Sequence, residues 1–241
     1  RLGPAELGVA AGAGRAMLQV AKRPTVAIVA TGDELVPPGQ PLLPGQIHDS
    51  NALSLAALAR EAGAMVSSIA HAADQARATS DALRTALDQA DLVVISGGVS
   101  VGPHDHVKPA LESLNVDEVF WRVKLRPGKP TWFGTKNDTL VIGLPGNPVS
   151  ALVTFVLFAR PALAAFQGAQ PPRSRRVELA TPLPRNPHRD EAHRVRLDEH
   201  GRAHSTGPQG SHQLSSLLGA DGLAIVPAGE GTISETDLVP L

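Results

Sequence analysis

The sequence contains no cysteine, carries almost no net charge and lacks a long uninterrupted apolar run. Without cysteine, disulfide bonds, thiolate metal sites and cysteine nucleophiles are all excluded, and the chain is compatible with any redox compartment. The 22 Lys and Arg residues are balanced by 23 Asp and Glu residues, which leaves no global basic field to recruit nucleic acid or anionic lipid. We therefore expect neither nucleic acid nor a membrane as a partner.

No apolar run reaches the roughly 18–20 residues that are needed to span a bilayer. The longest candidate, residues 149–166, is interrupted by Arg160 and Pro161. No signal peptide opens the chain, so we expect a cytoplasmic protein. The first residue is Arg rather than Met, and we expect the chain to be a fragment of a longer protein.

Between residues 25 and 166, apolar strand patterns alternate with helical patterns. Strands are expected at 25–31, 65–70, 91–96, 117–123 and 139–144. One helix is expected between Asn51 and Gly63, and another from Ser80 and Asp81 onward. The runs 26–30 and 92–95 are apolar throughout, which is typical of strands covered on both faces. These patterns predict an α/β domain of three layers, with a mostly parallel sheet flanked by helices.

The pattern changes after residue 166. Residues 167–176 (QGAQPPRSRR) are rich in Gly, Pro and Arg and have no apolar period, which suits a linker. Short alternating segments follow at 194–197, 224–226 and 232–239, and they predict a small all-β, barrel-like domain. We expect three parts: the tail of an absent N-terminal domain or linker at 1–23, the α/β domain at 24–172 and the β domain at 173–241.

Two polar loops follow buried strands of the predicted sheet: TGDEL at 31–35 and SGGVSVG at 96–102. Ligands bind at the carboxyl ends of strands in open α/β sheets, so the carboxylates of the first loop are candidate site residues. Glycines in the second loop let backbone N–H groups approach an anion, and serines add donors. Either loop is also compatible with an ordinary polar turn, and the second matches neither the Walker A nor the dinucleotide-binding fingerprint.

Three further segments carry polar groups. Asp105, between His104 and His106, is a candidate site carboxylate, a helix N-cap, or both. A cationic cluster surrounds the LRPGKP turn at 125–130 and suits either one bound anion or a solvated edge strand. The turn LPGNP at 144–148 opens a helix with free N–H groups, as would any well-built helix start.

These segments should meet along one sheet edge, where cations and N–H groups suit phosphates or an oxyanion. Carboxylates in the same place would repel such an anion unless Mg²⁺ lies between them. The residues alone therefore predict Mg²⁺-assisted chemistry on a phosphorylated or nucleotide-bearing substrate.

Together with GQIHDSN at 45–51 and QGSH at 209–212, these motifs resemble the molybdopterin molybdotransferase family (MoeA and the gephyrin E domain). The resemblance covers essentially the whole chain, in the family's order. It implies a MogA-like molybdopterin-binding domain at 24–172 and an enzyme that inserts molybdate into adenylylated molybdopterin, with release of AMP and a requirement for Mg²⁺. It also implies a homodimer in the full-length protein, in which the partner's N-terminal part completes the site, and an upstream enzyme that donates molybdopterin adenylate.

The resemblance implies roles for individual residues. Glu34, Asp74 and Asp105 match acidic active-site positions that would hold Mg²⁺, and Arg126 is the fourth expected catalytic residue. Arg122 and Arg126 stand where the family commonly has lysines, so a planar guanidinium replaces a compact ammonium. The residues expected to bind substrate are Thr31, Gly32, Ser96, Gly97, Gly98, Ser100, Arg122, Lys129, Pro145, Gly146, Asn147, Arg194 and Ser211.

Two alternatives remain open at this point. The MogA-type adenylyltransferase and CinA-type domains have a similar acidic turn and glycine loop, but GLPGNPVSA and the β unit with QGSH are not expected in either. A non-catalytic scaffold module is the other alternative, and it predicts a groove for a partner peptide between the β unit and the sheet domain.

Overall fold

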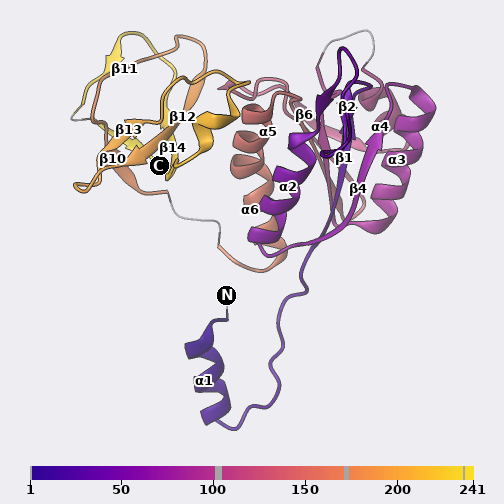
Figure 1. Cartoon of the computed structure of the whole chain (residues 1–241). Helices are drawn as coiled ribbons and strands as arrows, with labels where there is room; N and C mark the ends of the chain where they lie inside the picture. Colours follow the sequence, from indigo (N-terminus) through magenta and orange to yellow (C-terminus); the bar gives the residue numbers. More distant parts are fainter. Residues whose placement is uncertain (1, 101–104, 171–173, 236) are drawn as a thin grey trace.

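The computed structural model describes residues 2–100, 105–170, 174–235 and 237–241. An α/β domain and a smaller β unit lie side by side, and an N-terminal arm extends away from both (Figure 1). The arm carries α1 (Pro4–Gly12), in which no residue is buried. Its apolar side chains, Leu7 and Val9 among them, are exposed to solvent.

The α/β domain is built on a six-stranded sheet in the order β4-β1-β5-β9-β8-β6. The first four strands are parallel to one another, and β8 runs antiparallel to both of its neighbours, β9 and the edge strand β6. The strands are β1 (Thr25–Thr31), β4 (Met65–Ala72), β5 (Leu92–Ser96), β6 (Asp117–Trp121), β8 (Trp132–Lys136) and β9 (Thr139–Leu144). The mostly parallel sheet is confirmed, and β8 is a strand that the sequence patterns did not predict.

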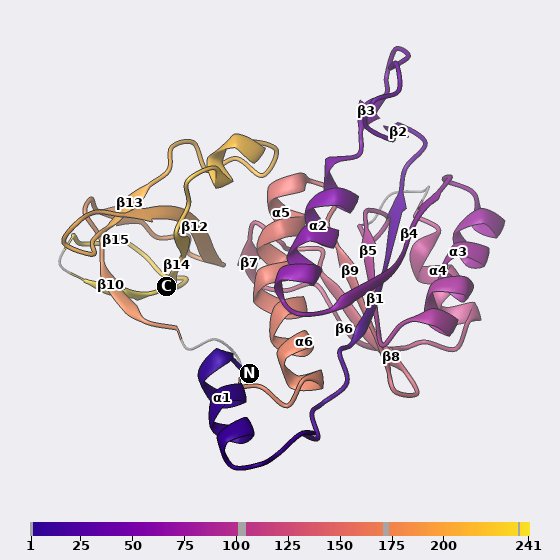
Figure 2. The same cartoon turned by 60° about the horizontal axis from the view of Figure 1, so that its bottom comes forward.

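Helices cover both faces of this sheet (Figure 2). Because side chains alternate along a strand, Ala27 and Val29 of β1 pack on one face while Val26 and Ile28 pack on the other. The first face is covered by α3 (Ala76–Gln89) and α4 (Val107–Ser113), and the second by α2 (Ser50–Glu61), α5 (Pro148–Thr154), the π-helical turn η1 (Phe155–Ala159) and α6 (Arg160–Phe166). The two cores give the predicted three layers.

Three expected helix starts are wrong. The N-cap of α2 is Asp49, whose side chain accepts a hydrogen bond from Ala52 N, so Asn51 lies inside the helix. α3 begins at Ala76, four residues before Ser80. The residue before α4 is His106, so Asp105 is not its N-cap.

The expectation that residues 149–166 are too interrupted to span a bilayer also needs correction. Residues 148–166 form one helical segment of 19 residues with a mean hydropathy of 1.9, long and apolar enough by those criteria. Pro161 does not end the helix: it lies in the first turn of α6, which follows the π-helical turn η1, and a proline is tolerated at such a position. Phe155, Ala159 and Leu163 of this segment are fully buried against the sheet.

The C-terminal unit is all-β, as predicted, with its own apolar core around Leu179, Val195 and Ala224. Its central strand β12 (Asp190–Leu197) pairs with β13 (Ala203–Ser205) and β14 (Gly222–Val226). Shorter pairs join β10 (Arg176–Glu178) to β16 (Leu238–Pro240) and β11 (Leu183–Pro184) to β15 (Thr232–Ile233). β12 also pairs in parallel with β7 (Leu125–Arg126) of the α/β domain, which connects the two units.

Candidate active site

A cavity of about 750 Å³ opens at the carboxyl edge of the sheet, beside the two-strand projection of β2 (Leu35–Val36) and β3 (Ile47–His48). The loops that follow β1, β4, β5 and β9 all contribute to its wall. The residues expected in the site that line this cavity are Thr31, Gly32, Glu34, Asp74, Ser96, Gly97, Gly98, Ser100, Asp105, Pro145, Gly146 and Asn147. The structure therefore brings the acidic positions, the glycine loop and the LPGNP turn together.

Two positions of the glycine loop, Gly97 and Gly98, leave no room for a side chain. Gly97 has a φ of +92°, and a Cβ there would lie 2.9 Å from both Thr31 O and Thr31 Oγ1. Gly98 has a φ of +63°, and its Cβ would lie 2.5 Å from Val107 Cγ2. Glycine adopts such backbone angles without steric cost, so these two positions let the chain pass between β1 and α4.

Asp105 is a buried carboxylate in the wall of this cavity. Both of its oxygens are buried, and neither has a hydrogen-bond partner among the residues that the structure describes. Burial raises the pKa of Asp105, and the nearby N–H groups of Val107, Ser100 and Lys108 oppose that shift without reaching hydrogen-bonding geometry. A buried carboxylate without a partner is costly unless a cation or proton compensates it, so its chemistry fits a hard cation such as Mg²⁺.

The other two acidic positions lie farther out. Glu34 is exposed, and its carboxylate folds back toward Gly32, where a Cβ would lie 2.6 Å from Glu34 Oε2. Asp74 donates its backbone N–H to Asp33 Oδ1 at 2.9 Å, which ties the loop after β4 to the TGDEL turn. Within the described ranges, no three acidic or histidine side chains come together as a preformed ion site. The three carboxylates thus share a cavity, and no shared coordination shell is formed.

The expected cations do not line the cavity. The Arg122 guanidinium stacks over the Trp121 ring at 4.1 Å, and Lys108 Nζ lies 3.5 Å from the same ring centroid. Lys129 is outside the lining, although its neighbour Pro130 is part of it. Arg126 Nη1 donates to Glu191 Oε1 at 2.8 Å. The predicted convergence of these cations on one anion is therefore absent from this arrangement.

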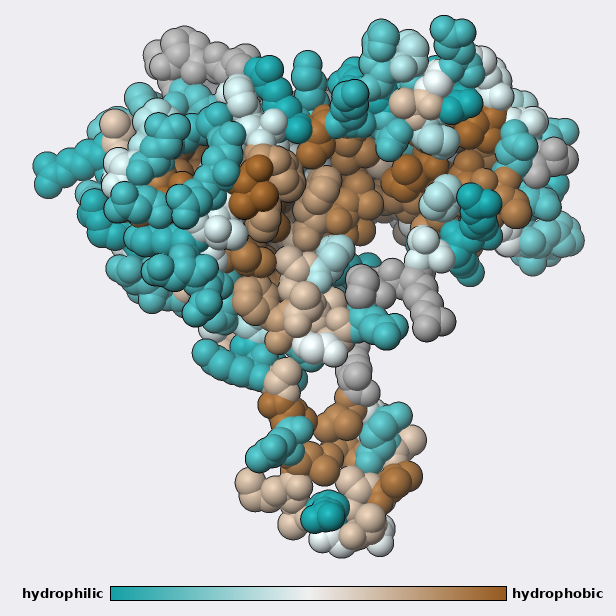
Figure 3. All heavy atoms as spheres, turned by 180° about the vertical axis from the view of Figure 1, so that it is seen from behind, coloured by the Kyte–Doolittle hydropathy of each residue, from teal (hydrophilic) through white to brown (hydrophobic). Residues whose placement is uncertain are grey.

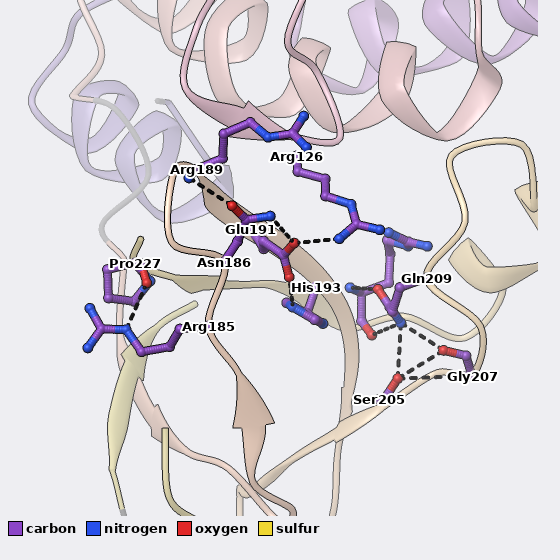
Figure 4. A network of polar contacts seen from close by, with 11 residues as sticks. Arg126, Arg185, Asn186, Arg189, Glu191, His193, Ser205, Gly207, Gln209 and Pro227 are labelled. Atoms are coloured by element: carbon purple, nitrogen blue, oxygen red, sulfur yellow. Dashed lines mark hydrogen bonds and ion pairs between the residues drawn. The ribbon is translucent and has the colours of Figure 1, made fainter. Parts of the chain in front are cut away.

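The Arg126–Glu191 ion pair belongs to a polar network where the two units meet (Figure 4). Burial opposes the charge on Glu191, but the Arg126 guanidinium and His193 outweigh it and hold the pKa of Glu191 below its usual value. His193 Nε2 lies 3.1 Å from Glu191 Oε2, while burial lowers the pKa of His193 itself. The network reinforces the parallel pairing of β7 with β12.

The C-terminal unit reaches the cavity through the QGSH loop. His212 lines the cavity, and Ser211 accepts hydrogen bonds from Val149 N at 3.1 Å and from Asn147 Nδ2 at 3.2 Å. Arg194 is buried behind this loop, where burial lowers its pKa. Its guanidinium donates to Ser216 Oγ and to the carbonyls of Pro208 and Gly210. In this structure Arg194 therefore shapes the loop that carries Ser211 and does not itself line the cavity.

Sequence reasoning named no site residue within the GQIHDSN motif, although residues 47–51 of this motif all line the cavity. Asp49 lines the cavity and is 2% exposed. One of its oxygens caps α2, and the other lies 2.7 Å from His71 Nε2. His48, directly before Asp49, also lines the cavity. The sequence did carry a signal for Asp49. It lies two residues before Asn51, at the start of the helical pattern, and aspartate is a favourable N-cap residue because its side chain accepts hydrogen bonds from the free N–H groups of the first turn.

A second cavity, of about 760 Å³, lies between the helices α5, η1 and α6 and the C-terminal unit. Its lining includes Leu152, Val156, Leu157, Leu223 and Ile225. Seen from behind, apolar side chains gather between the two units (Figure 3). The scaffold alternative predicted a groove at this place, and the apolar lining alone does not identify an occupant.

Two family models match this chain. Residues 27–165 match the family described as "Probable molybdopterin binding domain", and residues 176–241 match "MoeA C-terminal region (domain IV)".

Curated relatives match along nearly the whole chain. A protein of Mycobacterium tuberculosis strain H37Rv named molybdopterin molybdenumtransferase 2 is 40% identical over 232 residues, which are 93% of this chain and 57% of the relative. A molybdopterin molybdenumtransferase of Nostoc is 36% identical over 244 residues, covering 100% of this chain and 52% of the relative. The chain thus spans only about half the length of these two relatives.

Among solved structures, the molybdopterin biosynthesis MoeA protein of Pyrococcus horikoshii has a TM-score of 0.84 and 30% identity. That match covers 100% of this chain and 59% of the solved one. This solved structure therefore shares the arrangement of the α/β domain and the β unit.

Proposed function

We propose that this chain, which belongs to the MoeA family of molybdopterin molybdenumtransferases, provides the molybdate-inserting half of such an enzyme. The proposed reaction transfers molybdate to adenylylated molybdopterin and releases AMP, as a step of molybdenum cofactor biosynthesis. Molybdate and adenylylated molybdopterin are its substrates.

One observation carries this proposal: acidic residues, the glycine loop and the LPGNP turn line a single cavity at the carboxyl edge of a parallel sheet. This is the place where open α/β sheets bind their ligands. The match of residues 176–241 to the MoeA C-terminal region favours the transferase over an adenylyltransferase or CinA-like enzyme, for which no such unit is expected.

The Asp105 carboxylate, which no residue that the structure describes pairs with, supports Mg²⁺ as the metal of this site. Asp105 would hold it, together with Glu34 and Asp74 from the same cavity wall. When bound, Mg²⁺ supplies positive charge that offsets the phosphate oxygens of the adenylate. The ion would also relieve the cost of burying the Asp105 carboxylate.

The chain's own residues supply the remaining functions. Backbone groups of Gly97 and Gly98 lie at the cavity surface, where no side chain keeps an anion at a distance. The bond from Asn147 Nδ2 to Ser211 Oγ joins the QGSH loop to the LPGNP turn in the cavity wall. Arg126 must leave Glu191 to offset charge on a bound oxyanion, because in the present arrangement that carboxylate occupies it.

We further propose a cytoplasmic homodimer for the full-length protein, in which the partner's N-terminal part completes the site. The immediate donor would be the enzyme that makes molybdopterin adenylate. Neither nucleic acid nor a membrane is proposed as a partner.

The test is AMP release from adenylylated molybdopterin with Mg²⁺, with and without molybdate. It is run on this chain, on the full-length parent and on the parent carrying Asp105→Asn. We expect molybdate-dependent release by the parent and its loss in Asp105→Asn. A wild-type parent that releases no AMP under either condition refutes the transferase, whereas AMP incorporation into molybdopterin indicates the adenylyltransferase alternative.

A further inference from the structure

Asn51, in the first turn of α2, touches two other segments of the cavity wall. Its Nδ2 donates to Ser96 Oγ at 2.9 Å and to the carbonyl oxygen of Gly146 at 2.8 Å. Ser96 ends β5, and Gly146 lies in the turn that follows β9. One amide group therefore joins three segments that are 45 and 95 residues apart along the chain.

The orientation of this amide is determined by its partners. The Gly146 carbonyl can only accept a hydrogen bond, so the NH₂ group of Asn51 must face it. The Oδ1 atom then points elsewhere, and it is buried without a hydrogen-bond partner among the described residues. A buried acceptor that has lost water and gained no partner reduces stability. The Asn51 side chain therefore does not maximise stability at this position. Its hydrogen bonds instead link the end of β5 at Ser96 to the turn at Gly146.

The bond to Asn51 also determines what the Ser96 hydroxyl can do. Ser96 is 3% exposed and lines the cavity. Its oxygen accepts the Asn51 N–H, and no residue within the described ranges accepts a bond from it in turn. A hydroxyl has one proton, which is therefore free for an acceptor outside this network.

We propose that Asn51 is a positioning residue, which sets the Ser96 hydroxyl and the Gly146 turn so that Ser96 donates to an acceptor oxygen of the bound ligand. This inference rests on the proposed function, in which molybdopterin occupies the cavity. It assigns Asn51 an effect on ligand binding that acts through Ser96, and it gives Asn51 no contact with the reacting atoms.

The test is a double-mutant cycle in molybdopterin binding, measured by isothermal titration calorimetry on the full-length parent. The variants are Asn51→Ala, Ser96→Ala and the double substitution. Ser54→Ala is the matched control, because it removes a polar group from the same helix away from the cavity. Loss of one neutral hydrogen bond to the ligand weakens binding by about three- to tenfold.

We expect each single substitution to raise the dissociation constant by that factor, and the double variant to bind no more weakly than the weaker single one. Multiplying effects would refute the inference, since independent residues add in free energy. So would unchanged binding by Asn51→Ala with a lowered melting temperature, because that result describes a purely structural residue.

Two further outcomes are separable. If Asn51→Ala does not fold, Asn51→Leu replaces it in the cycle, because it removes the donor, roughly keeps the volume and adds no charge. If the wild-type full-length parent itself shows no molybdopterin binding, the proposed function fails and this inference fails with it. Binding by the wild type together with full binding by the variants refutes the inference alone.

Discussion

Replacing Gly98 by Ala tests whether the glycine loop is held by close contact. Gly98 has a φ of +63°, a region that costs an L-residue about 1–2 kcal/mol. The added Cβ would also lie 2.5 Å from Val107 Cγ2, and Val107 is buried at the start of α4. Such overpacking costs typically about 1–3 kcal/mol. We therefore expect Gly98→Ala to lower the free energy of unfolding by roughly 2–5 kcal/mol.

Gly219 provides the matched control. Its φ is +70°, and nothing lies within 4 Å of a Cβ built there. Gly219→Ala should therefore show the backbone cost alone, about 1–2 kcal/mol. The difference between the two variants, measured by urea unfolding of both, isolates the contact with Val107.

The double variant Gly98→Ala with Val107→Ala completes the experiment. Removing the Val107 methyl groups should recover part of the loss, so the two destabilisations should sum to more than the double variant shows. Equal destabilisation by Gly98→Ala and Gly219→Ala would refute the reasoning, because it would mean that the loop moves away from α4 at no cost.

Three other substitutions have clear expected outcomes. Asp105→Asn should raise the melting temperature at pH 7, because the folded-state pKa of Asp105 is raised and its charged form therefore destabilises the fold; a lower melting temperature would contradict the burial argument. The pKa of Glu191 is lowered in the folded state, so the stability that its charge contributes is fully present above its unfolded-state pKa. That stability is lost as the pH falls through its folded-state pKa. Glu191→Gln should accordingly flatten the decline in stability below about pH 4.5, as followed by thermal melts across pH. Leu163→Ala should cost about 2–5 kcal/mol in urea unfolding, since Leu163 is fully buried against the sheet.

The parallel sheet could be predicted because its strands carry local signals. Residues 26–30 and 92–95 are apolar throughout, and such runs occur where helices cover both faces. The LPGNP turn was also readable, since Asn147 and Pro148 form a well-formed helix start. In contrast, β8 begins at a Trp and includes a Gly, and only its pairing with β9 and β6 makes it a strand.

Helix starts were harder to predict because neighbouring residues compete for the cap position. Asp49 and Asn51 are both favourable N-cap residues, and local propensity does not choose between them. The choice was made by contacts distant in sequence: Asp49 meets His71, while Asn51 meets Ser96 and Gly146.

The sequence by itself determined the α/β class, the β unit and the set of acidic and glycine-rich segments, because periodicity and turn chemistry act over a few residues. Only the tertiary structure decided which of these segments share a cavity. It placed the Asp105 carboxylate there with no partner in the part of the chain that the structure describes, turned Arg126 toward Glu191 and buried Arg194 behind the QGSH loop. The physical reason is that a side chain's charge is visible in the sequence, whereas its partner depends on which distant strand folds beside it.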